Sequence, residues 1–135
     1  MTDRGPVYVA AGDEMKKLLE KRFPGCECVP FREDFSRGER EGGFFTARFI
    51  EERAAFWGVS AEKYREDMAP VIGLDLSRDL VLVFGEDACC RANLVFLLEH
   101  LAGRGYARPV RVRIVDEYDL SVKREYDQIP GGNGG

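Results

Sequence analysis

The chain has 135 residues, of which 44% are hydrophobic and 33% are charged, as in an ordinary globular protein. This length predicts one domain with a sizeable core and is too short for two independent domains. The net charge of −4 argues against a nucleic-acid surface, because phosphate binding needs a basic face. No apolar run is long enough to span a bilayer and no signal-peptide pattern is present, so we expect a cytoplasmic protein without nucleic-acid or membrane partners.

The first part of the chain predicts two strands with a helix between them. Residues 6–11 form a nearly continuous apolar run, which is typical of a strand buried on both faces. Asp13 is expected to cap the following helix, which ends at Pro24-Gly25. Residues 26–31 predict a second strand of mixed character, and the polar, glycine-containing residues 32–43 predict a loop.

The segment from about 42 to 73 predicts a helical insertion. From Phe44 to Trp57 aromatic residues recur at helical spacing, and Gly58 is a suitable stop. Ser60 is expected to cap a second helix, which Pro70 ends early or kinks. The aromatic residues favour core packing, and the alternative is a lid over a neighbouring crevice.

The remaining elements are a strand, a helix, a further strand and an extension. Residues 80–84 are uninterruptedly apolar and predict another buried strand. Asp87 is expected to cap a helix that runs to about Ala102. Residues 110–115 alternate between apolar and charged side chains, which indicates an edge strand. Residues 117–135 are expected to form a C-terminal extension with a disordered glycine-rich end.

These elements predict an α/β fold, namely a three-layer Rossmann-like domain over residues 1–116. Its sheet is expected to have four mainly parallel strands in the order 2-1-3-4, counted along the chain, if the crossovers are right-handed. The two all-apolar strands should lie at the centre of this sheet. Because the strand order reverses between the first and third strands, a crevice is expected beyond their carboxyl ends.

Three of the predicted strands end in polar clusters that would meet at this crevice. The candidate ligand-binding residues in and just beyond these clusters are Gly12, Asp13, Arg32, Asp34, Glu86, Asp87, Cys90 and Asn93. Their carboxylates would repel one another unless a divalent cation, a cationic ligand, or Arg32 and Arg37 balanced them. A purely structural interpretation is equally open for Asp13 and Asp87, because a helix cap stabilises by about 1 kcal/mol. No metal site is assigned, because no spacing signature supports one.

A nucleotide cofactor is not predicted. The turn after the first strand reads Ala-Gly-Asp, which is not a glycine-rich phosphate-binding loop. A capping aspartate at Asp13 would also compete with an anion for the helix N–H groups. No cofactor is therefore assigned.

The cysteines predict reduced, buried thiols. They stand at positions 26, 28, 89 and 90 and lack the Cys-x-x-Cys spacing of structural zinc sites. Cys90 falls near the third position of its helix, where the dipole lowers a thiol pKa, but Glu86 and Asp87 oppose that effect. His100 is expected on the surface about 15 Å further along the same helix, too far away to activate Cys90.

Four segments of the chain resemble a bacterial family known as domain of unknown function 1835. They are the Gly12-Asp13 turn and residues 31–38, 47–50 and 84–94. The chain departs from the family pattern at Ala11 (asparagine in the family), Phe35 (leucine), Glu39 (proline) and Arg91 (glutamine). The family has no established activity, so the resemblance implies the place of a site and no reaction.

The leading hypothesis is therefore a site for a small polar ligand at the carboxyl edge of the sheet. Such a site would suit carboxylate-assisted hydrolysis or transfer. The alternative hypothesis is a non-enzymatic protein–protein interaction or regulatory module, in which the strand-end residues only cap helices and brace loops. The sequence assigns neither a reaction nor an oligomeric state.

Overall fold

The computed structural model describes residues 5–39 and 43–131, which form five strands and four helices. In chain order these elements are β1 (Val7–Ala10), α1 (Asp13–Arg22), β2 (Glu27–Pro30), α2 (Ala47–Trp57), α3 (Ala61–Ile72), β3 (Leu80–Phe84), α4 (Ala88–Gly103), β4 (Val110–Val115) and β5 (Val122–Gln128). Apart from Gly131, the glycine-rich end that was expected to be disordered lies outside the described residues.

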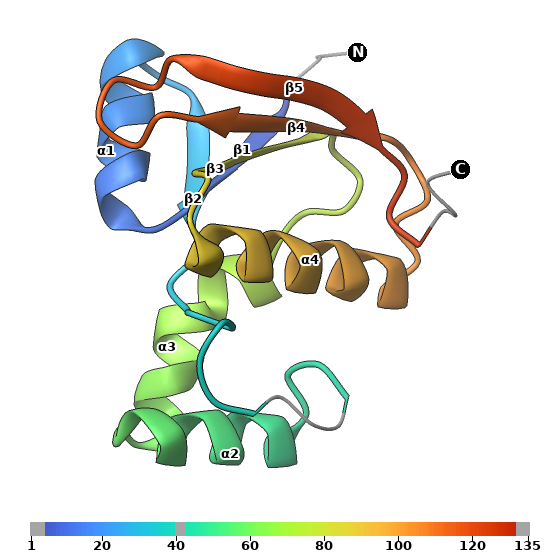
Figure 1. Cartoon of the computed structure of the whole chain (residues 1–135). Helices are drawn as coiled ribbons and strands as arrows, with labels where there is room; N and C mark the ends of the chain where they lie inside the picture. The colour runs from blue at the N-terminus through green and yellow to red at the C-terminus, as the bar shows by residue number, and fades with distance from the viewer. Residues whose placement is uncertain (1–4, 40–42, 132–135) are drawn as a thin grey trace.

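The strands form one five-stranded sheet in the order β2-β1-β3-β4-β5 (Figure 1). The first four strands are parallel, and β5 runs antiparallel to β4. The α/β class is confirmed, but the prediction of a four-stranded sheet was wrong. The additional strand β5 lies within residues 117–135, which were expected to be an extension.

The prediction that β4 is an edge strand was also wrong, because β4 lies between β3 and β5. Its alternating charges have a different cause. Arg111 donates from Nε to Asp127 of β5 at 2.9 Å, and Arg113 donates from Nε to Glu125 at 2.6 Å. The arginines therefore make cross-strand ion pairs on one face of the sheet, while the intervening valines are buried on the other.

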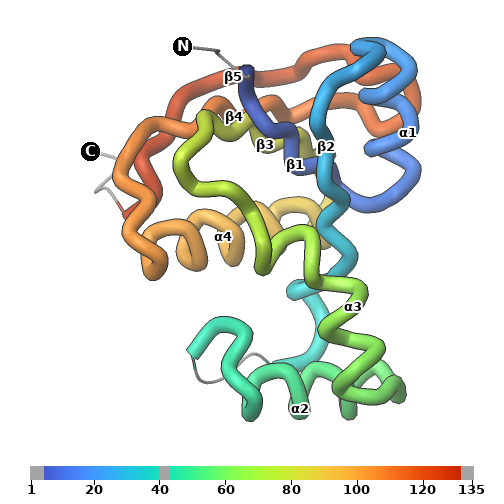
Figure 2. Tube along the Cα trace, turned by 180° about the vertical axis from the view of Figure 1, so that it is seen from behind, coloured from blue at the N-terminus to red at the C-terminus, as the bar shows by residue number. Residues whose placement is uncertain are grey.

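The apolar strands β1 and β3 are central, as predicted. Val9 and Val81 are only 0% and 6% exposed. Leu82 and Phe84 belong to a core that includes residues of α2, α3 and α4. Val81 and Val83 belong to a separate core with α1 on the opposite face. Helices thus cover both faces of the sheet, as Figures 1 and 2 show, and α2 and α3 lie together beside α4.

The insertion between β2 and β3 forms two helices, with boundaries that differ from the prediction. Thr46 caps α2 by accepting a hydrogen bond from the N–H of Phe49 at 3.3 Å. The predicted start at Phe44 was too early, since Phe45 has a left-handed φ of 57°. Helix α3 continues past Pro70, which lies in its last turn and removes only one intrahelical hydrogen bond there. Most of the aromatic side chains of the insertion pack into the core, in agreement with the packing interpretation.

Candidate functional site

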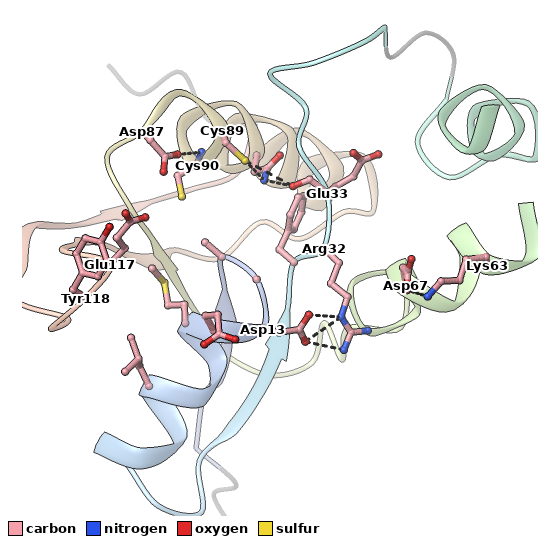
Figure 3. A pocket seen from close by; sticks show the side chains of 17 residues that line it. Asp13, Arg32, Glu33, Lys63, Asp67, Asp87, Cys89, Cys90, Glu117 and Tyr118 are labelled. Carbon is pink, nitrogen blue, oxygen red and sulfur yellow. Dashed lines mark hydrogen bonds and ion pairs between the residues drawn. The ribbon is translucent and has the colours of Figure 1, made fainter. Parts of the chain in front are cut away.

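A crevice of about 1150 Å³ lies at the carboxyl ends of the central strands (Figure 3). Its walls come from the start of α1, the loop after β2, one side of α3, the start of α4 and the β4–β5 loop. The strand order of the sheet reverses between β1 and β3, as the sequence predicted. The carboxyl edge of the sheet is therefore open between these two strands.

Six of the eight candidate residues line this crevice, and two do not. The six are Gly12, Asp13, Arg32, Asp87, Cys90 and Asn93. Asp34 instead lines a smaller neighbouring hollow together with Trp57, and its carboxylate accepts from the N–H of Ser36 at 2.9 Å. Glu86 is exposed outside the lining residues.

The side chain of Asp13 binds Arg32 and does not cap α1, so the prediction of a capping aspartate was wrong. Gly12 occupies the N-cap position with a φ of 91°, and Asp13 is the first residue of the helix. Arg32 donates to the Asp13 carboxylate from Nε at 3.1 Å and from Nη2 at 3.0 Å. This hydrogen-bonded guanidinium holds the pKa of Asp13 below its usual value.

The first turn of α1 consequently has no side-chain cap. Gly12, Asp13 and Glu14 all line the crevice, so the N-terminal end of the helix faces it. The N–H groups of a first helical turn have no partner within the helix and favour negative charge. The sequence predicted that a capping Asp13 would compete with an anionic ligand for these N–H groups. Because Asp13 does not cap α1, this competition is absent there.

Glu33, which was not among the predicted site residues, is the best-connected carboxylate at the crevice. Arg53 donates to it from Nε and from Nη2, both at 2.8 Å. Trp57 donates from Nε1 at 2.8 Å, and Tyr64 donates from its hydroxyl at 2.6 Å. The side chains of Glu33 and Arg53 are fully buried. Burial by itself raises the pKa of Glu33, but the hydrogen bonds from Arg53 and Tyr64 outweigh burial and lower it.

Arg53 and Asn93 hold the loop after β2 in position. Arg53 donates from Nη1 to the backbone carbonyls of Arg37 at 3.0 Å and Glu39 at 2.9 Å. Asn93 donates from Nδ2 to the carbonyl of Glu33 at 2.6 Å and accepts from the N–H of Phe35 at 2.8 Å. The buried amide of Asn93 is thus engaged with the loop, and its function in the structure is to brace it.

The start of α4 combines a confirmed cap with a buried thiol. Asp87 accepts a hydrogen bond from the N–H of Cys90 at 2.7 Å. Burial raises the pKa of Cys90 to about 11, and the charge of Asp87 adds to this effect. The sequence pointed to the acidic neighbours alone, whereas burial is the largest cause. Burial likewise raises the pKa of Cys89 to about 12, so burial disfavours the thiolate form of both side chains.

His100 is buried, so the expectation of a surface histidine was wrong. The residue is 4% exposed, and its ring lies 5.0 Å from the ring of Phe45 and 6.0 Å from that of Phe44, measured between centroids. Within the described residues its Nε2 has no hydrogen-bond partner. Burial lowers the pKa of His100 to about 4. Phe96 of the same helix stacks on the ring at 6.4 Å, whereas Phe44 and Phe45 come from the distant insertion, which sequence spacing could not place beside His100.

The charge of the crevice is predominantly negative. Its acidic lining residues are Asp13, Glu14, Glu33, Asp67, Asp87 and Glu117, and its basic ones are Arg32 and Lys63. Lys63 pairs with Asp67 at 2.9 Å, much as Arg32 pairs with Asp13. Across the described part of the chain, no group of three or more histidine, cysteine, aspartate or glutamate residues is arranged to hold a metal ion.

Comparisons with models of protein families, with curated proteins and with solved structures find no match. The resemblance to the family of unknown function therefore stays a prediction. Among the helices that the structure describes, none has the length and apolar character needed to cross a bilayer.

Proposed function

We propose that this chain binds a small polar ligand in the crevice at the carboxyl edge of its sheet. The observation that carries this proposal is the uncapped start of α1, which faces a crevice of about 1150 Å³ at the point where the strand order reverses. A volume of this order accommodates a metabolite-sized molecule. The N–H groups of the first turn of α1 would receive an anionic group of the ligand.

The charges of the lining support a ligand that also carries an amino group. Arg32 offsets the negative charge of Asp13, and Lys17 lies 3.4 Å from the carboxylate of Glu14. The carboxylates next to the helix start are therefore compensated. Glu117, on the β4–β5 loop, is an exposed carboxylate of the lining and would attract a positively charged group. A zwitterionic molecule would satisfy both parts of the crevice.

The described residues favour binding over catalysis. A general acid needs a raised pKa, whereas the pKa values of Asp13 and Glu33 are both lowered. The thiol pKa values at the start of α4 are raised, which disfavours a nucleophilic cysteine. His100 is enclosed by aromatic rings and is not among the residues that line the crevice.

A thermal-shift screen of small amino acids, amines and carboxylates tests the proposal. Zwitterions should stabilise the protein more than matched compounds that lack one of the two charges. Arg32→Gln, which leaves Asp13 uncompensated, and Glu117→Gln should each weaken binding by roughly tenfold. Glu20→Gln, on the exposed side of α1, is the matched control and should bind as the unmodified protein does. Equal affinity in all four proteins would contradict the assignment of the crevice.

One observation favours the alternative of an interaction module. Tyr118 is 81% exposed at the crevice, although a large aromatic side chain is normally buried. In that case the crevice residues would only brace the loops around a protein-binding surface. Tyr118→Ser should then abolish capture of a protein partner, and no compound in the thermal-shift screen should stabilise the chain.

A further inference from the structure

Strand β5 is the outer strand of the sheet on the side away from β2 (Figure 1). Within the described residues its only neighbour is β4, so one row of its backbone N–H and C=O groups is not used by the sheet. Most of its side chains are exposed. Val122, the first residue of the strand, and Ile129, which follows its last residue, are 54% and 48% exposed. An edge of this kind is a template for pairing with another strand.

We propose that β5 pairs in antiparallel orientation with β5 of a second copy of the chain, which joins the two sheets into one. The sequence Val-Lys-Arg-Glu-Tyr-Asp-Gln of this strand is complementary to itself when it is reversed about Glu125. In that register Lys123 lies opposite the partner's Asp127, and the symmetry repeats the pair on the other side of Glu125. Opposite charges that face each other across an antiparallel pair stabilise it.

The like charges at the centre of this register are already compensated. Glu125 would lie opposite the partner's Glu125, which is unfavourable for bare carboxylates. Each Glu125 accepts a hydrogen bond from Arg113 at 2.6 Å, and Nη1 of Arg111 lies 3.7 Å from its second oxygen. Two guanidinium groups of β4 therefore lie next to each Glu125 carboxylate, on the same face of the sheet.

The other face of β5 is also self-complementary. Arg124 lies over the ring of Tyr126 at 5.3 Å within the strand. In the paired strands Arg124 would lie opposite the partner's Tyr126, so the same cation–π contact could form across the interface. Pairing would also bring Val122 to within one residue of the partner's Ile129. Charged edge strands normally deter association, but the basic first half and the acidic second half of β5 match each other when two copies pair in antiparallel orientation.

Charge reversal at Lys123 and Asp127 tests this pairing. The unmodified protein should show a reversible monomer–dimer equilibrium by sedimentation velocity in the micromolar to submillimolar range. Lys123→Glu and Asp127→Lys should each weaken dimerisation by roughly tenfold or more, because each places like charges opposite one another. An equimolar mixture of the two variants should restore association, since the acidic side chain introduced in one variant then faces the basic side chain introduced in the other. Lys21→Glu, on α1, makes the same charge change away from β5 and should associate normally.

The thermal unfolding midpoint of each variant separates loss of pairing from loss of folding. A folded variant that no longer dimerises, with rescue in the mixture, supports the proposal. A protein that stays monomeric over the whole range would overturn it. Dimerisation that Lys123→Glu does not weaken, or a mixture that stays monomeric, would show that β5 is not the interface. The ligand proposal is independent of each of these results.

Discussion

At the scale of single residues, Glu33 anchors the loop that positions Arg32. Its carboxylate is held by Arg53, Trp57 and Tyr64, so the insertion is tied to the loop that carries Arg32 toward Asp13. A buried ion pair of this kind gives little net stability by itself, but the loss of one partner leaves a buried charge uncompensated.

Glu33→Gln should therefore lower the free energy of unfolding by about 3–5 kcal/mol. Arg53 would keep its charge and its buried position but would lose its ion pair, and an amide NH2 would replace one of the two oxygens that accept from it. Denaturant unfolding followed by the fluorescence of Trp57, the single tryptophan, measures the change. Glu62→Gln, at an exposed position of α3, is the control and should change stability by less than about 0.5 kcal/mol. A loss below about 1 kcal/mol for Glu33→Gln would contradict this account.

Glu33 also predicts a loss of stability in acid. Its pKa is lowered in the folded protein, so the unfolded chain takes up the proton first as the pH falls. The stability that ionised Glu33 contributes is present above its ordinary pKa of 4.5 and is lost as the pH falls through the lower, folded-state value. Glu33→Gln should remove this part of the acid sensitivity in unfolding curves recorded on both sides of pH 4.5.

His100 predicts a second pH dependence at less acidic pH. Its pKa is about 4 in the folded protein, whereas the ordinary pKa of histidine is 6.5. As the pH falls below 6.5, the unfolded chain therefore takes up the proton before the folded protein does. Stability should be full above this value and should fall by up to about 3 kcal/mol as the pH approaches 4. His100→Leu should flatten the pH dependence between about pH 5 and 6.5, where carboxylates contribute little. An unchanged slope would show that the histidine is not buried in its neutral form.

The cysteines should be slow to alkylate at neutral pH. Burial raises the pKa of Cys28 and Cys89 to about 12 and that of Cys90 to about 11. Iodoacetamide labelling followed by mass spectrometry should rise only in alkaline solution for these thiols. Selective labelling of Cys90 with an apparent pKa below neutrality would identify a nucleophile in the crevice instead of a packed side chain.

At the scale of elements, α1 and α4 begin in different ways although an aspartate stands at each start. Asp87 accepts from the backbone N–H of Cys90, whereas Asp13 is bound to Arg32 and leaves the N–H groups of α1 uncapped. Removal of the aspartate side chain should therefore cost a helix cap at α4 and only an ion pair at α1.

Asp87→Ala should destabilise the protein by about 1 kcal/mol, because a cap is lost. Asp87→Asn should restore most of that loss, since asparagine is also a good cap. Asp13→Ala removes only a partly exposed ion pair and should cost less than about 1 kcal/mol. Thermal unfolding of the three variants measures the difference. A larger loss for Asp13→Ala than for Asp87→Ala would show that Asp13 supports its helix after all.

Much of the fold could be predicted from the sequence, and the errors have identifiable physical causes. The uninterrupted apolar runs of β1 and β3 indicated central strands without any knowledge of their neighbours. Strand β5 was missed because its charges look like those of a solvated segment until Arg111 and Arg113 of β4 are placed beside them. Sequence spacing shows local patterns and not ion pairs between distant strands.

The site was predictable to the same extent. Its position depends only on the order of β1 and β3, which the extra strand leaves unchanged. The contacts of individual side chains were not predictable, because they join distant segments. Arg32 reaches Asp13 across 19 positions, and Arg53 reaches Glu33 across 20. The run of polar residues after β2 contains no signal that Glu33 is buried, or that the neighbouring Asp34 does not line the crevice.

At the scale of the whole molecule, the sheet separates two surfaces with different proposed functions. The crevice opens at the carboxyl ends of the central strands, and the free side of β5 runs along the margin of the sheet. Ligand binding and self-association should therefore be separable. Lys123→Glu should leave the ligand-induced thermal shift unchanged, and Arg32→Gln should leave the sedimentation behaviour unchanged. A change in both properties from either variant would show that the two surfaces are coupled.

The central claim is that the open start of α1 receives a ligand within the crevice. Titration of the ¹⁵N-labelled protein with the best zwitterion from the thermal-shift screen tests it most directly, residue by residue. We expect the largest shifts of amide resonances at Gly12, Asp13 and Glu14, with smaller ones at Glu117 and Tyr118. Shifts confined to other surfaces, or none at ligand concentrations that stabilise the protein, would contradict the claim.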